Sequence, residues 1–313
     1  MLVVGGAGFI GSHVVDQLLE EPVGRVVVLD NFARGARRNL ERARTDPRLE
    51  LVEGSIVDRG LLTRALEGVD YVFLLAALWL YECVHEPRAA VDVNIGGTFN
   101  VIEAAQRAGV KKVVFSSSAS IYGNAAFTPM TEEHPFNNRT TYGATKIAGE
   151  QLFRAFHEQH GLDYVALRYM NVYGPRMDRK GAYVSVIMKV LDRIDQGERP
   201  VVHGDGTQTF DFVHVEDVAR ANILALTSAA TDECINVGMG VPTTIRELVE
   251  RLLQLTGSTL APLYEPGHMF VTHRVGSTEK AERLLGFRAR VSLEDGLRSV
   301  LAWRYPGRVL ADA

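Results

Sequence analysis

The chain has 313 residues, of which 46% are hydrophobic and 23% charged, and its formal net charge is −4. This composition is typical of a soluble globular protein, and the chain is long enough for one large domain or two lobes. Its net negative charge provides no general positive surface for binding nucleic acid. No apolar run approaches the roughly 20 residues of a membrane span, neither terminus reads as a signal peptide, and the two cysteines, Cys83 and Cys234, lack the spacing of metal ligands. We therefore expect a cytoplasmic protein with reduced cysteines, no metal, no nucleic-acid partner and no membrane contact.

The N-terminal residues form a pattern typical of dinucleotide binding. A short apolar strand, Leu2–Val4, leads into the glycine-rich run Gly5–Gly11, an amphipathic helix follows, and a second apolar strand, Val26–Leu29, ends in Asp30. The glycines permit a tight turn and let backbone N–H groups approach a pyrophosphate, which the helix dipole also favours. Strand, glycine turn, helix, strand and acid in this order predict a nucleotide-binding unit.

The residue Asp30 bears on the choice of cofactor. It lies 19 residues beyond Gly11, about where an acid binds the adenosine ribose diol, and its charge would repel a 2′-phosphate. We therefore expect NAD. Arg34, Arg37 and Arg38 follow closely and keep NADP open as an alternative.

Further strand candidates alternate with helical stretches. Strands are expected at 49–52, 71–75, 113–115 and 164–167, and a long helix at 87–108. Units of this length are typical of a parallel sheet with helices on both faces. Asp58 follows one strand and could reach an adenine edge, while the small side chains of Ala76 and Ala77 would let a cofactor lie close.

A phenol and an ammonium share one face of a predicted helix. Tyr142 and Lys146 are four residues apart in an amphipathic stretch that Gly161 ends. A nearby ammonium lowers the pKa of a phenol from about 10 toward the working pH, as a proton-transfer catalyst requires. Upstream, the hydroxyl-rich run Ser116–Gly123 follows an apolar strand, at the end where ligands of open α/β sheets bind.

After Arg168 the pattern changes to shorter elements and turns. We expect helices at 184–196, 218–227 and 245–255, and a segment at 211–215 that returns toward the sheet. This divides the chain into a nucleotide-binding domain at 1–169, to which 211–236 returns, and a smaller lobe at 170–313. The crevice between two such lobes is the expected substrate site.

Together these residues resemble the extended short-chain dehydrogenase/reductase superfamily, in its nucleotide-sugar epimerase/dehydratase branch. The resemblance covers nearly the whole chain and is carried by Gly5–Gly11, Asp30, Asp58, Ala76, Ala77, Asn94, Gly97–Thr98, Ser116–Gly123, Tyr142, Lys146, Asn171–Arg176 and His214–Val218. It implies a Rossmann-type, doubly wound parallel sheet of the α/β class with a smaller C-terminal substrate-binding lobe. It also implies cofactor contacts from Gly5, Gly8, Phe9, Ile10, Gly11, Asp30, Asn31, Ile56, Asp58, Ala76, Ala77, Asn94, Tyr142 and Lys146.

The resemblance also implies roles at a nucleotide sugar. Tyr142 would take the proton of the sugar C4 hydroxyl, while Lys146 would hold the nicotinamide ribose and lower the phenol's pKa. Ser118 would hydrogen-bond the sugar oxygen, and Ser117 competes for that role. The implied substrate contacts are Ser118, Asn171, Arg176, Arg274 and Trp79.

The hydroxyl-rich run helps to choose the reaction. The 4,6-dehydratases that this chain resembles carry an acid pair after the hydroxyl residue, and uronate decarboxylases carry a Glu there, whereas Ser116–Gly123 contains no carboxylate. We therefore favour a 4-epimerase acting on an NDP-hexose such as UDP-glucose, UDP-GlcNAc or UDP-glucuronate. The alternatives are a 4-keto-sugar reductase, a dehydrogenase or a dehydratase of the same superfamily.

Some positions depart from the family pattern. Phe210 stands where relatives usually place a phosphate-binding Arg, and Ser277 replaces an Asp common after Arg274. The bulky run at Trp79 either shapes the sugar pocket or fills a loop core. Relatives pair through helices equivalent to 87–108 and 142–160, so the resemblance also implies a homodimer.

Overall fold

A computed structural model describes residues 1–178, 185–267 and 271–307. Its centre is a seven-stranded sheet in the order β11-β6-β5-β4-β1-β2-β3, and every neighbouring pair is parallel. The strands are β1 (Leu2–Val4), β2 (Val26–Asp30), β3 (Leu49–Glu53), β4 (Tyr71–Leu74), β5 (Lys112–Ser118), β6 (Tyr164–Tyr169) and β11 (Glu233–Val237). The Rossmann-type α/β fold expected from the sequence is confirmed.

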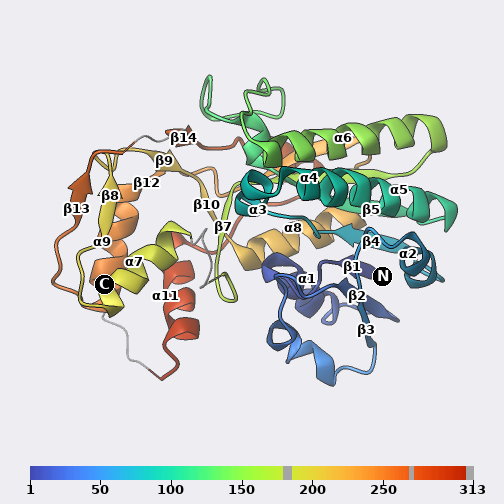
Figure 1. Cartoon of the computed structure of the whole chain (residues 1–313), viewed down its shortest axis with the longest axis horizontal. Helices are drawn as coiled ribbons and strands as arrows, with labels where there is room; N and C mark the ends of the chain where they lie inside the picture. The colour runs from blue at the N-terminus through green and yellow to red at the C-terminus, as the bar shows by residue number, and fades with distance from the viewer. Residues whose placement is uncertain (179–184, 268–270, 308–313) are drawn as a thin grey trace.

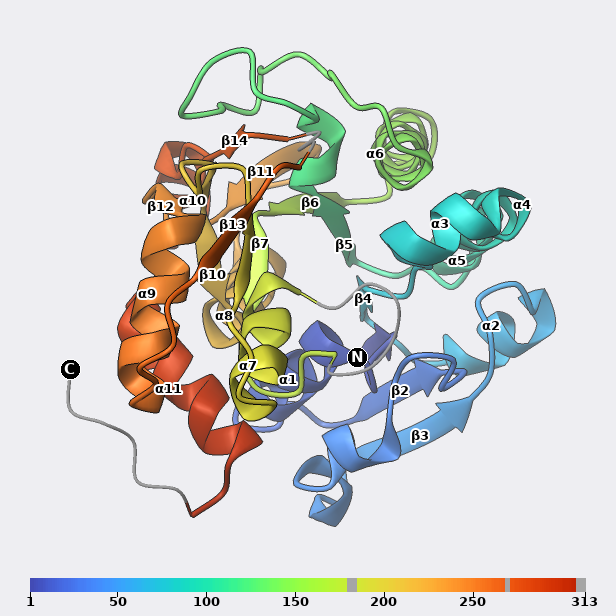
Figure 2. The ribbon, with the colours of Figure 1, turned by 60° about the vertical axis from the view of Figure 1, so that its left-hand side comes forward.

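Helices cover both faces of this sheet (Figures 1 and 2). Side chains alternate along a strand, so Val3 of β1 packs into the core with α1 (Phe9–Leu18) and α8 (Val215–Thr227), whereas Leu2 and Val4 pack into the core on the other face. That second face is covered by α2 (Arg59–Ala65), α5 (Thr98–Arg107) and α6 (Thr141–His160). Burial on both faces explains why these strands read as continuous apolar runs.

The helix expected at 87–108 is one helical path with a wide turn inside it. It consists of α4 (Pro87–Ala90), the π-helix η3 (Val91–Gly97) and α5, preceded by α3 (Leu80–His85). Gly97 lies against Ile56, where a Cβ atom would come within 2.5 Å of the Ile56 side chain. Asn94 lies in this π turn and is buried.

A second lobe follows the sheet domain and packs around its own core (left in Figure 1). Its helices are α7 (Val186–Asp195), α9 (Ile245–Thr256) and α11 (Leu293–Arg304). The smaller α10 (Glu279–Leu285) packs instead on the sheet domain, against β11 and α8. Short strands form small sheets: β8 (Val201–His203) with β13 (Leu263–Glu265), β9 (Thr209–Phe210) with β12 (Thr243–Thr244) and β14 (His273–Arg274), and β7 (Asn171–Tyr173) with β10 (Phe212–His214). We call this part the C-terminal lobe.

The chain returns to the large sheet after leaving it. The segment expected to return at 211–215 pairs instead with β7, as strand β10, and the strand that joins the large sheet is β11, beside β6.

None of the helices in the described part of the chain combines the length and apolar character of a membrane span.

Candidate active site

The glycine turn after β1 forms a cradle that only glycine can build. Gly5 has φ +83°, and a Cβ atom there would lie 2.7 Å from the backbone nitrogen of Ala76. A Cβ atom at Gly11 would lie 2.2 Å from the carbonyl oxygen of Gly5. Beside Gly8 the space is open apart from that same carbonyl oxygen, at 3.2 Å. The turn thus leaves room for a ligand against bare backbone at the N-terminus of α1, as a pyrophosphate requires.

The carboxylate of Asp30 is held in a fixed position at the end of β2. Its two oxygens accept hydrogen bonds from the backbone N–H of Ala7 at 2.9 Å and of Phe32 at 2.8 Å. Burial raises the pKa of this carboxyl group. A Cβ atom at Gly35 would lie 2.7 Å from Asp30 Oδ1, so the following loop wraps closely around the acid.

The other residues expected at the cofactor fall into two groups. Phe9 and Ile10 begin α1, directly after the glycine turn, and Ala76 and Ala77 follow β4 beside it. Three more make local structural contacts: Asn31 accepts from Ala33 N–H, Asp58 caps α2 by accepting from Leu61 N–H at 2.9 Å, and Ile56 is buried against Gly97. The structure therefore gives Asp58 the role of a helix cap.

Asn94 organises the segment that follows β4. Its amide exchanges hydrogen bonds with Leu78, accepting from the N–H at 2.7 Å and donating to the carbonyl oxygen at 2.9 Å. It also donates to Thr145 Oγ1 of α6 at 3.1 Å. These contacts make Asn94 a residue that positions the Ala76–Trp79 segment next to the helix of Tyr142 and Lys146.

Tyr142 and Lys146 meet the end of β5 as the helical spacing predicts. Thr140 caps α6, which ends at Gly161 in the left-handed region with φ +68°. Lys146 is buried and donates from Nζ to the carbonyl oxygen of Ser116 at 2.6 Å, and this nitrogen lies 5.6 Å from the centre of the Tyr142 ring. The phenol of Tyr142 lies near the hydroxyl of Ser118, whose interaction with it acts to lower the phenol's pKa.

The electrostatics of this pair differ from the sequence-based expectation. Burial raises the pKa of Tyr142 to about 12, although the Ser118 hydrogen bond and the charge of Arg34 act in the opposite direction. Burial likewise lowers the pKa of Lys146 to about 8. The net shift of the phenol's pKa is therefore upward, because the cost of desolvating the phenolate exceeds the opposing effects of Ser118 and Arg34. The role of Lys146 toward the phenol stays a prediction.

Ser117 is not part of this arrangement. The strand β5 runs through all three serines rather than ending before them, so Ser117 points to the opposite face from Ser118. It is buried and donates to Glu150 Oε1 at 2.5 Å. Glu150 in turn forms a buried ion pair with Arg168, with 2.8 Å between Oε2 and Nη2. The role of Ser117 as an alternative catalytic hydroxyl is therefore wrong.

The substrate contacts expected from the C-terminal lobe are separated in the structure. Asn171 lies on β7, where its amide donates to the carbonyl oxygen of Asp211 at 3.3 Å. Arg176 turns toward α1 and pairs with Asp16, with 2.6 Å between Nη2 and Oδ2. Arg176 therefore joins the lobe to α1 in this structure, and its role in substrate binding stays a prediction.

Phe210 and Arg274 are neighbours in adjacent strands. They are Cα partners in the parallel pair β9 and β14, so a cation stands beside the aromatic side chain that replaces the usual arginine. Phe210 packs against the C-terminal lobe core and meets Phe212 edge-on at 6.4 Å between ring centres. Trp79, which precedes α3, stacks under Arg34 at 4.7 Å.

Asp211, which was not singled out from the sequence, joins the junction of β9 and β10 to the segment that follows β11. It is buried and accepts from the backbone N–H of Met239 at 2.7 Å and of Gly240 at 2.9 Å. Burial raises its pKa to about 6. An acid between Phe210 and Phe212 in an apolar strand is the signal that would have indicated it.

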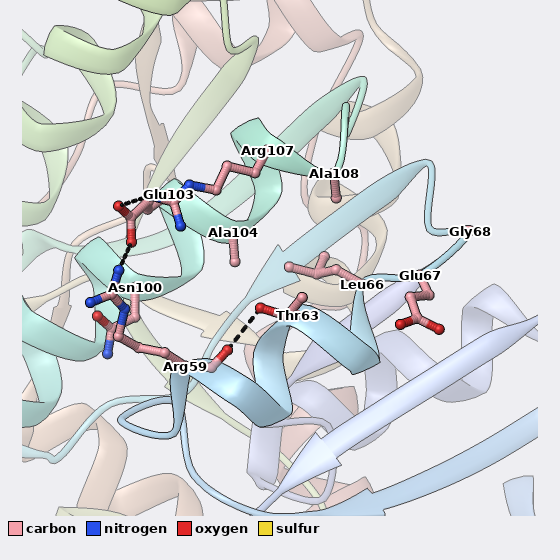
Figure 3. Close-up of a pocket in the computed structure, with 10 residues that line it drawn as sticks. All are labelled: Arg59, Thr63, Leu66, Glu67, Gly68, Asn100, Glu103, Ala104, Arg107 and Ala108. Atoms are coloured by element: carbon pink, nitrogen blue, oxygen red, sulfur yellow. Dashed lines mark hydrogen bonds and ion pairs between the residues drawn. The ribbon is translucent and has the colours of Figure 1, made fainter.

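A surface groove of about 350 Å³ lies elsewhere, between α2 and α5 (Figure 3). Glu103 pairs there with Arg59 and Arg107, each at 2.7 Å. A second hollow, of about 540 Å³, includes the Glu150–Arg168 pair. Neither contains Tyr142, Lys146 or Ser118, so the candidate site is the arrangement at the end of β5 and the adjoining glycine turn.

Comparison with known proteins places the chain in a family. A family model described as the NAD-dependent epimerase/dehydratase family matches residues 1–238. Over 306 residues the chain is 35% identical to a putative UDP-glucose 4-epimerase of Methanocaldococcus jannaschii, covering 97% of each chain. The chain belongs to the NAD-dependent epimerase/dehydratase family. The resemblance drawn from its motifs is thereby confirmed.

Other members of this family differ in reaction. The crystal structure of the UDP-glucose 4-epimerase of Thermotoga maritima with UDP-glucose superposes with a TM-score of 0.90 at 38% identity, covering 97% of each chain. A dTDP-glucose 4,6-dehydratase of Actinoplanes sp. is 33% identical over 318 residues and covers 97% of each chain. Membership therefore establishes an enzyme of the epimerase/dehydratase superfamily without fixing the reaction.

NAD is the cofactor of this family and of this chain, and the residues present fit it. The glycine cradle leaves bare backbone at the start of α1, and Asp30 offers a fixed carboxylate one strand away. Such a carboxylate accepts hydrogen bonds from a ribose diol.

Proposed function

We propose that the protein is an NAD-dependent nucleotide-sugar 4-epimerase, which inverts C4 of an NDP-hexose through a transient 4-keto sugar. The proposal is supported by the family, by the epimerases among its relatives, and by the contact of Tyr142 with Ser118 at the end of β5. Such a reaction needs one proton acceptor, one hydroxyl that orients the sugar oxygen, and room for the keto sugar to turn over.

The chain's own residues would handle the proton. Tyr142 takes the proton of the C4 hydroxyl and later returns it, and Ser118 holds the sugar oxygen beside the phenol. Lys146, fixed by the Ser116 carbonyl, keeps a positive charge near the Tyr142 ring. NAD, when bound, supplies the hydride acceptor and donor. The glycine cradle and Asp30 would hold it.

The observation that carries the proposal is the lack of a free acid at this strand end. Elimination or decarboxylation calls for a further acid or base beside the sugar, and the run Ser116–Gly123 contains only hydroxyl, apolar and glycine residues. Glu150, the carboxylate that α6 brings to β5, is buried in its pair with Arg168 on the other face. Proton transfer through Tyr142 alone fits an epimerase.

Recognition of the diphosphate would come from Asn171 and Arg274. Asn171 stands at the start of β7, and Arg274 lies in register with Phe210, where relatives usually place an arginine. Because Arg274 sits next to that position, it can replace the missing cation. Trp79, in the segment that Asn94 positions, would contact the sugar.

The experiment is an NMR assay without added cofactor. Purified protein is incubated with UDP-glucose, UDP-GlcNAc and UDP-glucuronate, and the products are resolved. We expect conversion of one of these sugars to its C4 epimer with catalytic amounts of protein. Formation of only 4-keto-6-deoxy sugars or pentoses would reject epimerisation.

A 4-keto-sugar reductase or a sugar dehydrogenase is the second candidate, favoured by Phe210. Without the usual phosphate-binding arginine, an ordinary UDP-sugar would be held less firmly. Such an enzyme consumes NAD(P)H or NAD⁺ stoichiometrically. Turnover that stops when one equivalent of cofactor is used would support it over the epimerase.

We also propose that the protein is a cytoplasmic homodimer with the division of labour expected from the sequence. Its two cysteines are free, as in a reducing compartment. The sheet domain, residues 1–169 with 211–236, would hold NAD, and the rest would hold the sugar nucleotide. The paired helices α5 and α6 expose Phe99, which stacks edge-on against Phe156 at 5.6 Å, and apolar residues exposed in this way favour a partner surface.

A further inference from the structure

One arginine joins three separate segments around the glycine turn. Arg34 follows β2, and its guanidinium lies over the ring of Trp79 at 4.7 Å. Its Nη1 donates to both carboxylate oxygens of Glu82 in α3, at 3.2 and 3.3 Å. Its Nη2 pairs with Asp178, in the turn that follows β7.

The sheet order places this bridge over the glycine turn. β1 lies between β2 and β4 and pairs with both. A side chain that starts after β2 and contacts Trp79 and Glu82, which follow β4, therefore passes across the carboxyl end of β1. That end leads directly into Gly5–Gly11, where the diphosphate of a dinucleotide sits against the N-terminus of α1.

The partner Asp178 belongs to the C-terminal lobe. The turn 174–178 is continuous with that lobe's core through Tyr173 and Met177. It is also fastened to α1 at two further points: His13 Nε2 lies 3.1 Å from the carbonyl oxygen of Pro175, and Arg176 pairs with Asp16 at 2.6 Å. Both α1 residues belong to the helix that the glycine turn begins.

Two residues with positive φ restrict the backbone conformation of this turn. Gly174 has φ +149°, and a Cβ atom there would come within 2.4 Å of Val215. Arg176 has φ +68°, which is uncommon for a residue other than glycine. The turn therefore presents Asp178 to Arg34 from a defined position.

We propose that Arg34 is a cofactor-retaining residue, which closes over the diphosphate of bound NAD and is held there by Trp79, Glu82 and Asp178. A guanidinium has five N–H donors in a planar fork, which suits phosphate oxygens and carboxylates at once, and its face stacks on an indole. Release of NAD then requires Arg34 to leave these partners. The inference rests on the cofactor alone, and it holds whichever sugar reaction the enzyme catalyses.

The test measures how fast the purified holoenzyme releases NAD. Isotopically labelled NAD is added in excess, and its exchange into the protein is followed by mass spectrometry. Arg34→Gln removes the charge and the fork, and we expect it to speed release about five- to tenfold, in keeping with the loss of partly exposed ion pairs and a cation–π contact. Higher salt should speed release from the unaltered protein more than from the variant, because salt screens these pairs.

A neighbouring arginine supplies the matched control. Arg37 lies three residues further along, at the start of the 3-10 helix η1 (Arg37–Leu40). It stacks on Phe32 at 4.4 Å and pairs with Glu53 at the end of β3, on the side away from β4. Arg37→Gln removes the same charge and should leave the release rate unchanged. Arg34→Lys, which keeps the charge but lacks the planar guanidinium, should give an intermediate rate of NAD release. Asp178→Asn should speed release, because it weakens the ion pair between Arg34 and the C-terminal lobe.

Specific outcomes would overturn the proposal. A release rate in Arg34→Gln equal to that of the unaltered protein, or equal to that of Arg37→Gln, would show that Arg34 does not retain the cofactor. If Arg34→Gln bound NAD faster and released it more slowly than the unaltered protein, Arg34 would obstruct the cofactor site rather than retain the cofactor. A rate of NAD release in Asp178→Asn equal to that of the unaltered protein would show that the contact with the C-terminal lobe does not help to retain the cofactor. If Arg34→Gln fails to fold, Arg34→Lys carries the same test.

Discussion

At the scale of residues, two adjacent serines illustrate how a strand separates function from support. Ser118 and Ser117 differ by one position on β5, and the alternation of the strand sends one hydroxyl to Tyr142 and the other to Glu150. The first takes part in the proposed chemistry, and the second completes a buried ion pair. Substitution of Ser118 should therefore lower turnover, whereas substitution of Ser117 should lower stability.

Ser118→Ala should lower kcat by about 10²- to 10³-fold, because it removes a hydrogen bond to the reacting oxygen. Ser117→Ala should leave activity per folded molecule nearly unchanged and lower the free energy of unfolding by about 1 kcal/mol, because Glu150 loses a donor. Kinetics in the NMR assay and urea unfolding separate the two effects. Equal losses of turnover in the two variants would contradict the assignment.

Burial of Lys146 sets a pH dependence of stability. Its pKa is lowered from 10.5 to about 8, so between these values the folded chain binds fewer protons than the unfolded chain, and the contribution of Lys146 to stability rises with pH. Below about pH 8 the full cost of burying the ammonium is present. The lysine thus costs stability under the conditions in which the enzyme would work.

Lys146→Met should therefore raise the free energy of unfolding at pH 7 by about 1–3 kcal/mol and raise it less at pH 10. Urea unfolding of the NAD-free proteins at the two pH values measures the difference. The same gain at both pH values, or a loss at pH 7, would show that burial of the ammonium is not the dominant effect.

Sequence patterns could predict the site residues that lie at a characteristic spacing from one another along the chain. The glycine turn lies within one short loop, Asp30 ends the strand that follows it, and Tyr142 and Lys146 lie in one helix. Arg176 could not be placed in this way, because its partner Asp16 is 160 residues away and only the packing of the lobe on α1 joins them. The raised pKa of Tyr142 likewise depends on burial, which spacing does not encode.

At the scale of elements, long periodic helices and apolar strands were predicted closely, and their irregularities were not. The helix after Tyr142 ends at Gly161 as expected. The π turn η3 and the extension of β5 through Ser118 were missed, because both depend on contacts with other elements. Asn94 in η3 bonds to Leu78 and Thr145, and the serines of β5 pair with β6.

The exposed apolar side chains on α5 and α6 lead to a prediction about assembly. Phe99 is 39% exposed although it stacks on Phe156. Phe99→Glu would place a charge in the proposed dimer interface, so we expect it to shift the protein to a monomer in light scattering after size-exclusion chromatography. Phe127, 49% exposed on a separate loop, gives the control, because Phe127→Glu should leave the dimer intact. A monomeric unaltered protein would contradict the proposal.

At the scale of the whole molecule, the chain builds two lobes by leaving the large sheet and returning to it. β11 joins the edge of the sheet after the chain has passed through the first half of the C-terminal lobe, and the turn 174–178 fastens that lobe to α1. The alternation of strands and helices predicts the parallel sheet. The pairing of the short strands in the lobe follows from tertiary contacts, which is why the segment at 211–215 was expected at the large sheet and lies instead beside β7.

The central claim is that Tyr142 transfers a proton to and from a sugar hydroxyl beside NAD. The most direct measurement is the turnover of Tyr142→Phe with the nucleotide sugar that the unaltered protein converts, together with the NAD content of both proteins. The account predicts a loss of turnover of at least about 10²-fold with NAD still bound. Turnover equal to that of the unaltered protein would contradict it.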